Sequence, residues 1–165
     1  MSGVTFTELL RYTELETAKW HLFLKSAGPA ILDVPIDTAG QKDVRGVLLH
    51  IFAVELRYSE RLLEKEDVTP YDALPSGTLD DLFGIYAKAR ENFKTWLSST
   101  HERDMAKVIT FKTITAGTLS ASKRKCLIHA LLHSVRHWAQ MANTLRIRGY
   151  KQDWMHDFLM TDAME

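Results

Sequence analysis

The 165-residue sequence contains a single cysteine, Cys126, and this scarcity excludes a framework of internal disulfides. A chain without disulfides suits a reducing compartment, so we expect a cytoplasmic protein. Neither sign of charge is in excess, since Lys and Arg together number 21 and Asp and Glu together also number 21. Without a basic field or a run of like charges, we expect no binding to nucleic acid.

Long apolar runs are also missing. No segment approaches the roughly 18 consecutive apolar residues that a membrane-spanning helix needs, so we expect no membrane partner. The N-terminal residues MSGVTFTELLRYTELE lack a basic head followed by an apolar stretch, which predicts that they are not a signal peptide. Aromatic residues, in contrast, are plentiful, with 4 Trp, 5 Tyr and 7 Phe, and they argue against disorder. The length predicts a single domain over residues 1–165 with a core of its own.

Apolar residues recur at helical spacing in four segments. Thr5 followed by Glu8 is a capping box, and it predicts a first helix that ends at about Gly28. A second helix is predicted from near Asp43 to near Lys65. The first two predicted helices are joined by a connector that contains two prolines and a glycine.

A third helix is predicted to open at Thr78, with Asp81 three residues later as a shorter analogue of the capping-box acid. The fourth begins after Ser120 or Ser122 and continues to about Arg148. Between these two helices, residues 101–122 are rich in Val, Ile, Thr and Phe and predict an extended or hairpin-like crossover. The sequence therefore predicts an all-α fold, a four-helix bundle with a longer crossover connection between helices 3 and 4. The tail after residue 149 is expected to add one short helix.

Two histidines in the fourth predicted helix, His133 and His137, lie four residues apart and therefore leave the same helix face. Two neutral imidazoles beside an apolar face can share one divalent metal ion. A third histidine, His50, lies in the second predicted helix. The apolar positions that flank the pair and are expected to pack inward are Ile128, Leu131, Leu132, Val135, Met141 and Leu145.

Spacing alone leaves the ligand set open, because His129 also lies four residues before His133. The row of three rises roughly 12 Å along the helix, too far for one ion to bind all of them without distortion. A buried, hydrogen-bonded histidine is the commoner explanation for any one of these residues. Cys126 is better explained as a small buried apolar residue than as a ligand.

Two familiar metal motifs are excluded by the neighbouring residues. A zincin helix needs a glutamate directly after its first histidine, whereas His133 is followed by Ser134. A di-iron bundle needs Glu-x-x-His pairs on two helices, and none occurs at His50, His133 or His137.

Two segments resemble the signatures of the DinB superfamily. Residues 133–150, HSVRHWAQMANTLRIRGY, are similar to its C-terminal motif, in which His-x-x-x-His is followed by Gln three residues later and then by Leu-Arg and Gly. Residues 47–62, VLLHIFAVELRYSERL, resemble its other signature of an apolar run, His, further apolar residues, Glu and Leu. The resemblance covers nearly the whole chain. One departure is Trp138-Ala139, where the family often has Arg-Gly, and this changes the groove beside the histidines.

The resemblance implies a four-helix bundle in which His50, His133 and His137 bind one divalent ion, zinc or nickel, while His129 is left out. It also implies a homodimer and a relation to transferases of low-molecular-weight thiols such as bacillithiol and mycothiol. Three nitrogen ligands leave a position open for a water molecule or a thiol. We therefore expect a metal-dependent thiol transferase acting on small electrophiles. The alternatives are a metal-dependent hydrolase and a non-catalytic, dimeric, stress-associated metal-binding protein.

Other residues near the histidines are candidates for supporting roles. From their spacing, Glu55 and Gln140 are predicted to orient ligand rings or the substrate. The competing interpretations are that Glu55 is a surface acid paired with Arg57 or Arg61 and that Gln140 makes a packing or capping contact. Three arginines are candidates to bind an acidic cosubstrate, although a solvated helix face explains them more simply: Arg136, Arg146 and Arg148. Four aromatic residues are candidates to line a pocket, although an aromatic core explains them more simply: Tyr58, Trp138, Tyr150 and Trp154.

Overall fold

Local capping determines where the four long helices begin. The computed structural model describes residues 4–38, 40–113 and 116–164. The Thr5–Glu8 capping box opens α1 (Phe6–Ala27), and the pair Thr78–Asp81 forms a second capping box before α3 (Leu79–Ser99). Both boxes satisfy backbone N–H groups that have no partner within the helix. The two predicted helix starts are thus found at the predicted residues.

The other two long helices also begin at side-chain caps. Asp43 accepts a hydrogen bond from the N–H of Gly46 and opens α2 (Val44–Leu62). Ser122, rather than Ser120, accepts from the N–H of Lys125 and opens α5 (Lys123–Ile147). α2 ends at Leu62, a few residues earlier than predicted.

Two small antiparallel hairpins lie in the connections. β1 (Pro35–Thr38) pairs with β2 (Gln41–Asp43) after a short 3₁₀ helix, η1 (Pro29–Asp33). A short helix, α4 (Glu102–Met105), precedes β3 (Val108–Lys112), which pairs with β4 (Thr118–Ser122). The hairpin-like structure predicted within residues 101–122 is present, whereas the first hairpin was not predicted.

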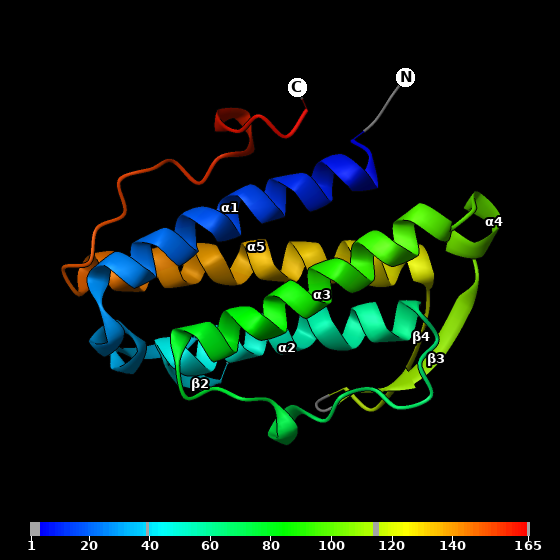
Figure 1. Cartoon of the computed structure of the whole chain (residues 1–165), viewed down its shortest axis with the longest axis horizontal. Coiled ribbons are helices and arrows are strands. Elements are labelled where there is room, and N and C mark those ends of the chain that lie inside the picture. Colours follow the sequence, from blue (N-terminus) through cyan, green and yellow to red (C-terminus); the bar gives the residue numbers. More distant parts are fainter. Residues whose placement is uncertain (1–3, 39, 114–115, 165) are drawn as a thin grey trace.

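The four long helices form a bundle in which α2 packs against α3 and α5, and α1 packs against α5 and α3 (Figure 1). α2 and α3 run in the same direction, and α1 and α5 run in the opposite one. The α3–α5 connection is the longest, as predicted, but it joins helix ends on the same side of the bundle. The segment that runs back along the bundle is 63–78, between α2 and α3, and it contains the 3₁₀ helix η2 (Tyr71–Ala73).

Two side chains of α2, Glu60 and Arg45, fasten this returning segment to the helix. Glu60, which is 2% exposed, accepts hydrogen bonds of 2.8 Å from both the backbone N–H and the hydroxyl of Thr69. At the other end of the segment, Arg45 donates to the backbone carbonyls of Ser76 and Gly77. These contacts keep α3 in register beside α2.

Aromatic side chains fill the centre of the bundle. Trp20 of α1 stacks on Trp138 of α5 with ring centroids 5.1 Å apart, and Phe52 of α2 contacts the edge of Trp138. The C-terminal tail, including the 3₁₀ helix η3 (Phe158–Met160), lies along α1, where Glu16 accepts hydrogen bonds from the indole N–H groups of Trp20 and Trp154. Of the six positions that flank the histidine pair, Leu131, Met141 and Leu145 are buried in the core as predicted. Ile128 and Val135 are only partly buried, and Leu132 is 51% exposed.

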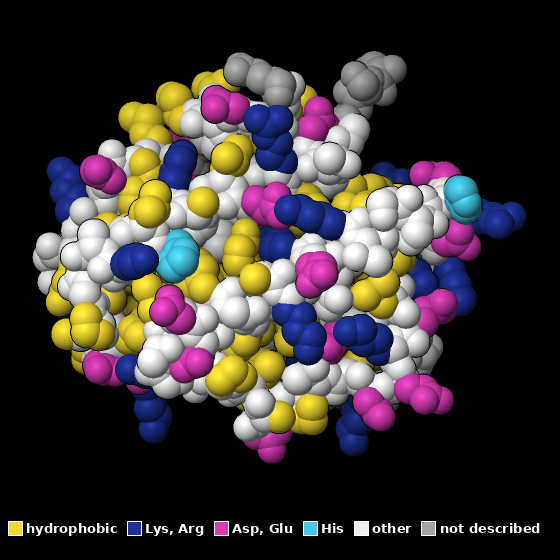
Figure 2. Space-filling model, in the orientation of Figure 1, with side chains coloured by type: hydrophobic (Ala, Val, Ile, Leu, Met, Phe, Trp, Pro, Cys, Tyr) yellow, Lys and Arg dark blue, Asp and Glu magenta, His cyan; other side chains and the backbone are white. Residues whose placement is uncertain are grey.

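On the face drawn in Figure 2, basic and acidic side chains are interspersed, and no large area carries charge of one sign. Among the described residues, no helix is long and apolar enough to span a membrane.

Candidate metal centre

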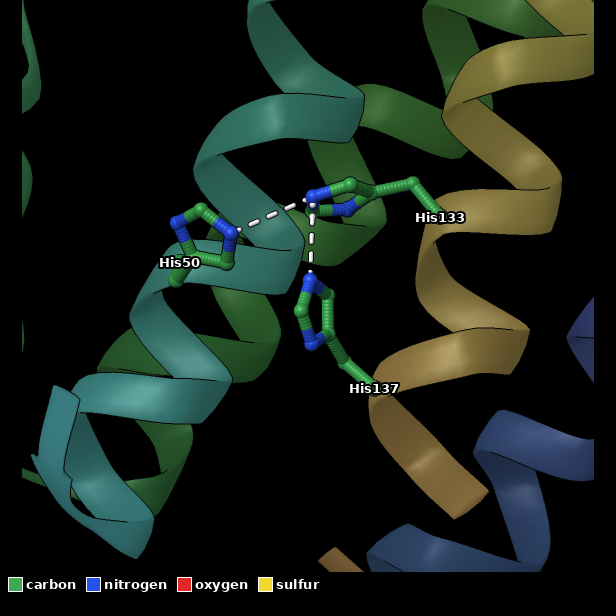
Figure 3. A group of neighbouring side chains, drawn as sticks. All are labelled: His50, His133 and His137. Atoms are coloured by element: carbon green, nitrogen blue, oxygen red, sulfur yellow. Dashed lines mark hydrogen bonds between the residues drawn. The ribbon is translucent and has the colours of Figure 1, made fainter. Parts of the chain in front are cut away.

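Three histidines from two helices converge on one point. His50 comes from α2, whereas His133 and His137 come from successive turns of α5 (Figure 3). The Nε2 atom of His133 lies 3.1 Å from the Nε2 atom of His50 and 3.1 Å from that of His137. Each residue offers one nitrogen, and the three nitrogens lie within 4.8 Å of one another. Antiparallel packing of α2 on α5 therefore brings together residues that are 83 positions apart.

Gln140 determines which nitrogen of His137 faces the other two rings. The Nδ1 atom of His137 lies 2.7 Å from the Oε1 atom of Gln140, one helical turn further along α5. An amide oxygen only accepts, so Nδ1 carries the proton and the Nε2 atom of His137 presents its lone pair. This is how metal-binding histidines are normally oriented by a second hydrogen bond.

The surroundings favour uncharged rings at all three positions. Burial, together with the neighbouring His137 and Arg136, lowers the pKa of His50 to about 4. Burial and the neighbouring histidines lower the pKa of His133 to about 3, and burial also lowers the pKa of His137. Neutral imidazole is the form that binds a metal ion.

The arrangement fits a divalent cation better than it fits mutual hydrogen bonds. The Nε2 atom of His133 faces two other Nε2 atoms, but with a single proton or lone pair it can make only one favourable contact of this kind. The low pKa values mean that no extra proton relieves the conflict near neutral pH. A cation relieves it. Nitrogens bound to a tetrahedral ion at about 2.1 Å lie about 3.4 Å apart, close to the two separations of 3.1 Å from His133.

His129 is not part of this group. Its ring contacts the edge of Tyr58, with centroids 5.1 Å apart, and lies 5.6 Å from the ring of His133. Cys126, one turn further back on α5, is buried at 1% exposure among apolar side chains, and burial raises the pKa of its thiol. Neither residue therefore joins the three converging nitrogens.

Arg136 is the nearest of the three candidate arginines to the histidines. It is exposed, and its guanidinium donates a 3.1 Å hydrogen bond to the Nε2 lone pair of His137, so Arg136 must turn aside when an ion takes that lone pair. Arg146 and Arg148, near the end of α5, are also exposed, and within the described part of the chain neither is hydrogen-bonded to the three histidines. The structure thus places one positive charge at the edge of the site.

Glu55 lies at a different place from the one its spacing suggested. It is fully buried, and its Oε1 atom accepts hydrogen bonds from Arg90 of α3 at 2.5 Å and from the hydroxyl of Ser134 of α5. Burial raises the pKa of Glu55, while Arg90 and Ser134 act against that rise. No hydrogen bond of Glu55 reaches a histidine among the described residues, nor does it pair with Arg57 or Arg61. It links three helices beside His133 instead.

Arg90 was not predicted as a functional residue, although the sequence contains a signal for it. Arg90 is 4% exposed and also donates to the hydroxyl of Thr13 in α1. It lies four residues after Tyr86 and three before Phe93, within the apolar face of its helix. A charged residue on such a face predicts a buried partner of opposite charge.

Three of the four candidate aromatic residues pack rather than line the site. Trp138 is 2% exposed and stacks on Trp20, and Trp154 packs on the same residue from the tail. Tyr150 is partly buried against the core. Tyr58, in contrast, lies between His129 and Phe111, with ring centroids 5.1 and 5.6 Å away. Tyr58 is therefore the aromatic candidate closest to the histidine row.

The fold and the three converging histidines define a four-helix-bundle protein with a group of side chains that could bind a metal ion. The sequence matches the DinB family model over residues 1–164, and the chain belongs to the DinB family. No curated protein matches the chain in sequence.

Proposed function

We propose that the protein binds one divalent metal ion through the Nε2 atoms of His50, His133 and His137. The observation that carries this proposal is the convergence of three neutral nitrogens from two helices, with the Nδ1 proton of His137 held by Gln140. Zinc or nickel is the proposed ion, because imidazole nitrogen suits both.

We propose further that the site transfers a low-molecular-weight thiol to a small electrophile. An ion held by three neutral nitrogens supplies Lewis acidity that lets a thiol lose its proton near neutral pH. The thiol sulfur then forms a bond to the electrophilic carbon, the leaving group departs with its electron pair, and the thiol proton passes to solvent. Within the chain, Gln140 keeps His137 oriented, and the exposed guanidinium of Arg136 offers an acidic cosubstrate a partner.

Elemental analysis of the purified, untagged protein tests the metal proposal. We expect about one zinc or nickel per chain in the wild type and at most a small fraction of that in His50→Ala. His129→Ala is the matched control, because it removes a neighbouring histidine of α5 that lies outside the group, and it should keep its metal. Equal loss in the two variants would show that the ligands were assigned one turn away from their true positions. No metal in any of the three, even after incubation with excess zinc, would contradict the proposal.

The main competing candidate is a non-catalytic metal-binding dimer. It is favoured by large apolar side chains that are exposed near the end of α5 and in the tail, including Ile147 at 76% and Leu159 at 85%. Light scattering would measure the dimer, and thiol consumption with a panel of electrophiles would measure the transferase. A metal-loaded dimer that consumes no thiol would favour this second candidate. Ester or amide cleavage without thiol would favour a hydrolase.

A further inference from the structure

A second polar site lies at the C-terminal end of α2. An open surface hollow of about 350 Å³ is lined by the last turns of α2, by residues 64–68 and by β3. Two arginines of α2, Arg57 and Arg61, line it together with Lys112 of β3. The three histidines do not line this hollow.

The arginines of this hollow are not neutralised by the protein. Arg57 forms no hydrogen bond or ion pair with any residue that the structure describes, and its Nε atom is buried without a partner. Arg61 also forms no ion pair within the described part of the chain, and it donates to the backbone carbonyl of Lys112 at 3.2 Å. A buried guanidinium N–H without a partner costs free energy unless a ligand satisfies it.

The acids around the hollow do not supply that partner. Glu64 is bound to Lys107 and lies 3.4 Å from the ammonium of Lys123. Glu60 is occupied by Thr69 and by Lys65, at 3.6 Å. Glu66, the remaining acid of the lining, forms no ion pair with a described residue. The groups facing the hollow without an anionic partner are therefore mainly cations.

Aromatic rings hold Arg61 in place. Its guanidinium carbon lies 5.0 Å from the ring centroid of Tyr58 and 4.6 Å from that of Phe111. Such stacking fixes the plane of a guanidinium, and the N–H groups of Arg61 that are not donated to Lys112 remain available to a carboxylate. Burial and the positive charge of Arg57 both lower the pKa of Arg61, which reflects two like charges held side by side.

The hollow lies along the same face of α2 as the candidate metal site. Arg57 and Arg61 follow His50 by seven and eleven residues, spacings that return to one helix face after about 10 and 16 Å. A continuous row of rings joins the two places. The ring of His133 contacts His129, His129 contacts Tyr58, and Arg61 lies over Tyr58.

We infer that Arg57 and Arg61 form a carboxylate-binding subsite for one end of an elongated small thiol whose sulfur lies at the histidines. The identification of the ligand as a thiol rests on the proposed function, whereas the carboxylate subsite rests on the arginines alone. A thiol roughly 10–16 Å long with a terminal carboxylate matches the rise along α2 from His50 to Arg57 and Arg61. Small thiols without a carboxylate lack this contact and bind more weakly.

Succinate binding to the metal-free protein tests the subsite without depending on the metal. Isothermal titration should show succinate binding to the wild type, weakened at least about tenfold in Arg57→Gln. The single variant is chosen because Arg57 has no partner to lose, and Arg57→Gln/Arg61→Gln should weaken binding further. Lys94→Gln, which removes a cation of α3 that pairs with Glu14, is the control and should bind as the wild type does.

Three outcomes would overturn the inference. These are no succinate binding to the wild type, equal binding by Arg57→Gln, and tighter binding of inorganic phosphate than of succinate, which would assign the subsite to phosphate. With metal-loaded protein, Arg57→Gln should raise KM about tenfold for glutathione and leave it unchanged for 2-mercaptoethanol. If the protein binds no metal but succinate binding depends on Arg57, the proposed function fails and the subsite stands.

Discussion

At the scale of single residues, the candidate metal site depends on the proton of His137. That proton lies on Nδ1 because the Oε1 atom of Gln140 accepts it at 2.7 Å. Without this acceptor, His137 gains freedom to change tautomer and to turn its Nε2 atom away from the other two histidines.

Replacing Gln140 should therefore weaken metal binding without removing a ligand. We expect Gln140→Ala to raise the dissociation constant for zinc about tenfold, in line with the usual effect of losing such a partner. Gln140→Glu keeps an accepting oxygen on a side chain of the same length and should stay within a few-fold of the wild type. Competition with a chromogenic chelator measures both. If the two variants are equally weak, Gln140 contributes packing rather than an acceptor.

The low pKa values of the histidines predict a dependence of stability on pH in the metal-free protein. Burial and neighbouring charges lower the pKa of His50 to about 4 and that of His133 to about 3, whereas both titrate near 6.5 in the unfolded chain. As pH falls below about 6.5, the unfolded state gains protons that the folded state does not. The free energy of unfolding should therefore decrease between pH 6.5 and 4.

Urea unfolding in the presence of a chelator, at pH 7.5, 6 and 5, measures this decrease. His133→Asn cannot titrate, so its free energy of unfolding should decrease less steeply than that of the wild type. His101→Asn, at an exposed position outside the bundle core, should follow the wild type. If the free energy of unfolding of His133→Asn decreases with falling pH as steeply as that of the wild type, other groups cause the acid sensitivity.

At the scale of helices, Glu55 and Arg90 hold α2, α3 and α5 together beside the site. Glu55 is 0% exposed and Arg90 4% exposed, and their atoms lie 2.5 Å apart. Removing one partner of a buried pair leaves an unpaired charge, which typically costs about 3–5 kcal/mol. We expect this cost for Arg90→Met, measured by chemical unfolding.

Two further variants separate charge burial from loss of contacts. Glu55→Leu/Arg90→Met removes both charges and should recover much of the lost stability. Lys94→Met, on the same helix as Arg90, breaks a more exposed pair with Glu14 of α1 and should cost no more than about 1 kcal/mol. If Arg90→Met costs as little as Lys94→Met, the buried pair does not fasten the helices.

The sequence predicted the helices well because their ends depend on neighbouring residues. Thr5 and Thr78 were recognised as caps from side chains only three positions away, and the predicted boundaries agree with α1 and α3. The choice between Ser120 and Ser122 could not be made, because both lie in β4 and only the hydroxyl of Ser120 is engaged across the hairpin, by Thr110. That contact depends on pairing between strands, which local spacing does not encode.

The candidate site was predicted only in part for the same reason. Helical periodicity placed His133 and His137 on one face, but the meeting with His50 depends on how α2 packs on α5. The meeting of His50 with His133 and His137 was predicted from resemblance to a family rather than from spacing. Glu55 was predicted to orient a ligand ring or the substrate, with a surface pair to Arg57 or Arg61 as the alternative. Its contacts are with Arg90 and Ser134 on two other helices, which spacing along one helix does not encode.

At the scale of the whole molecule, a bound ion would connect two helices that the chain itself joins only through distant loops. One ligand lies on α2 and two lie on α5, so an ion bound to all three nitrogens stabilises the packing of α2 on α5. Binding to the folded state alone adds about 2.7 kcal/mol when free metal is 100 times its dissociation constant. For a chain of this size we expect Tm to rise by about 5–10 °C.

The size of this rise in the variants shows whether the ion connects the two helices. His50→Ala keeps both ligands of α5 but removes the only one on α2, so added zinc or nickel should raise its Tm by less than a third of the wild-type value. His129→Ala keeps all three ligands and should show the full rise. Differential scanning calorimetry of untagged protein measures both. A full rise in His50→Ala would mean that α5 binds the ion by itself, and the proposed role of α2 in the site would be wrong.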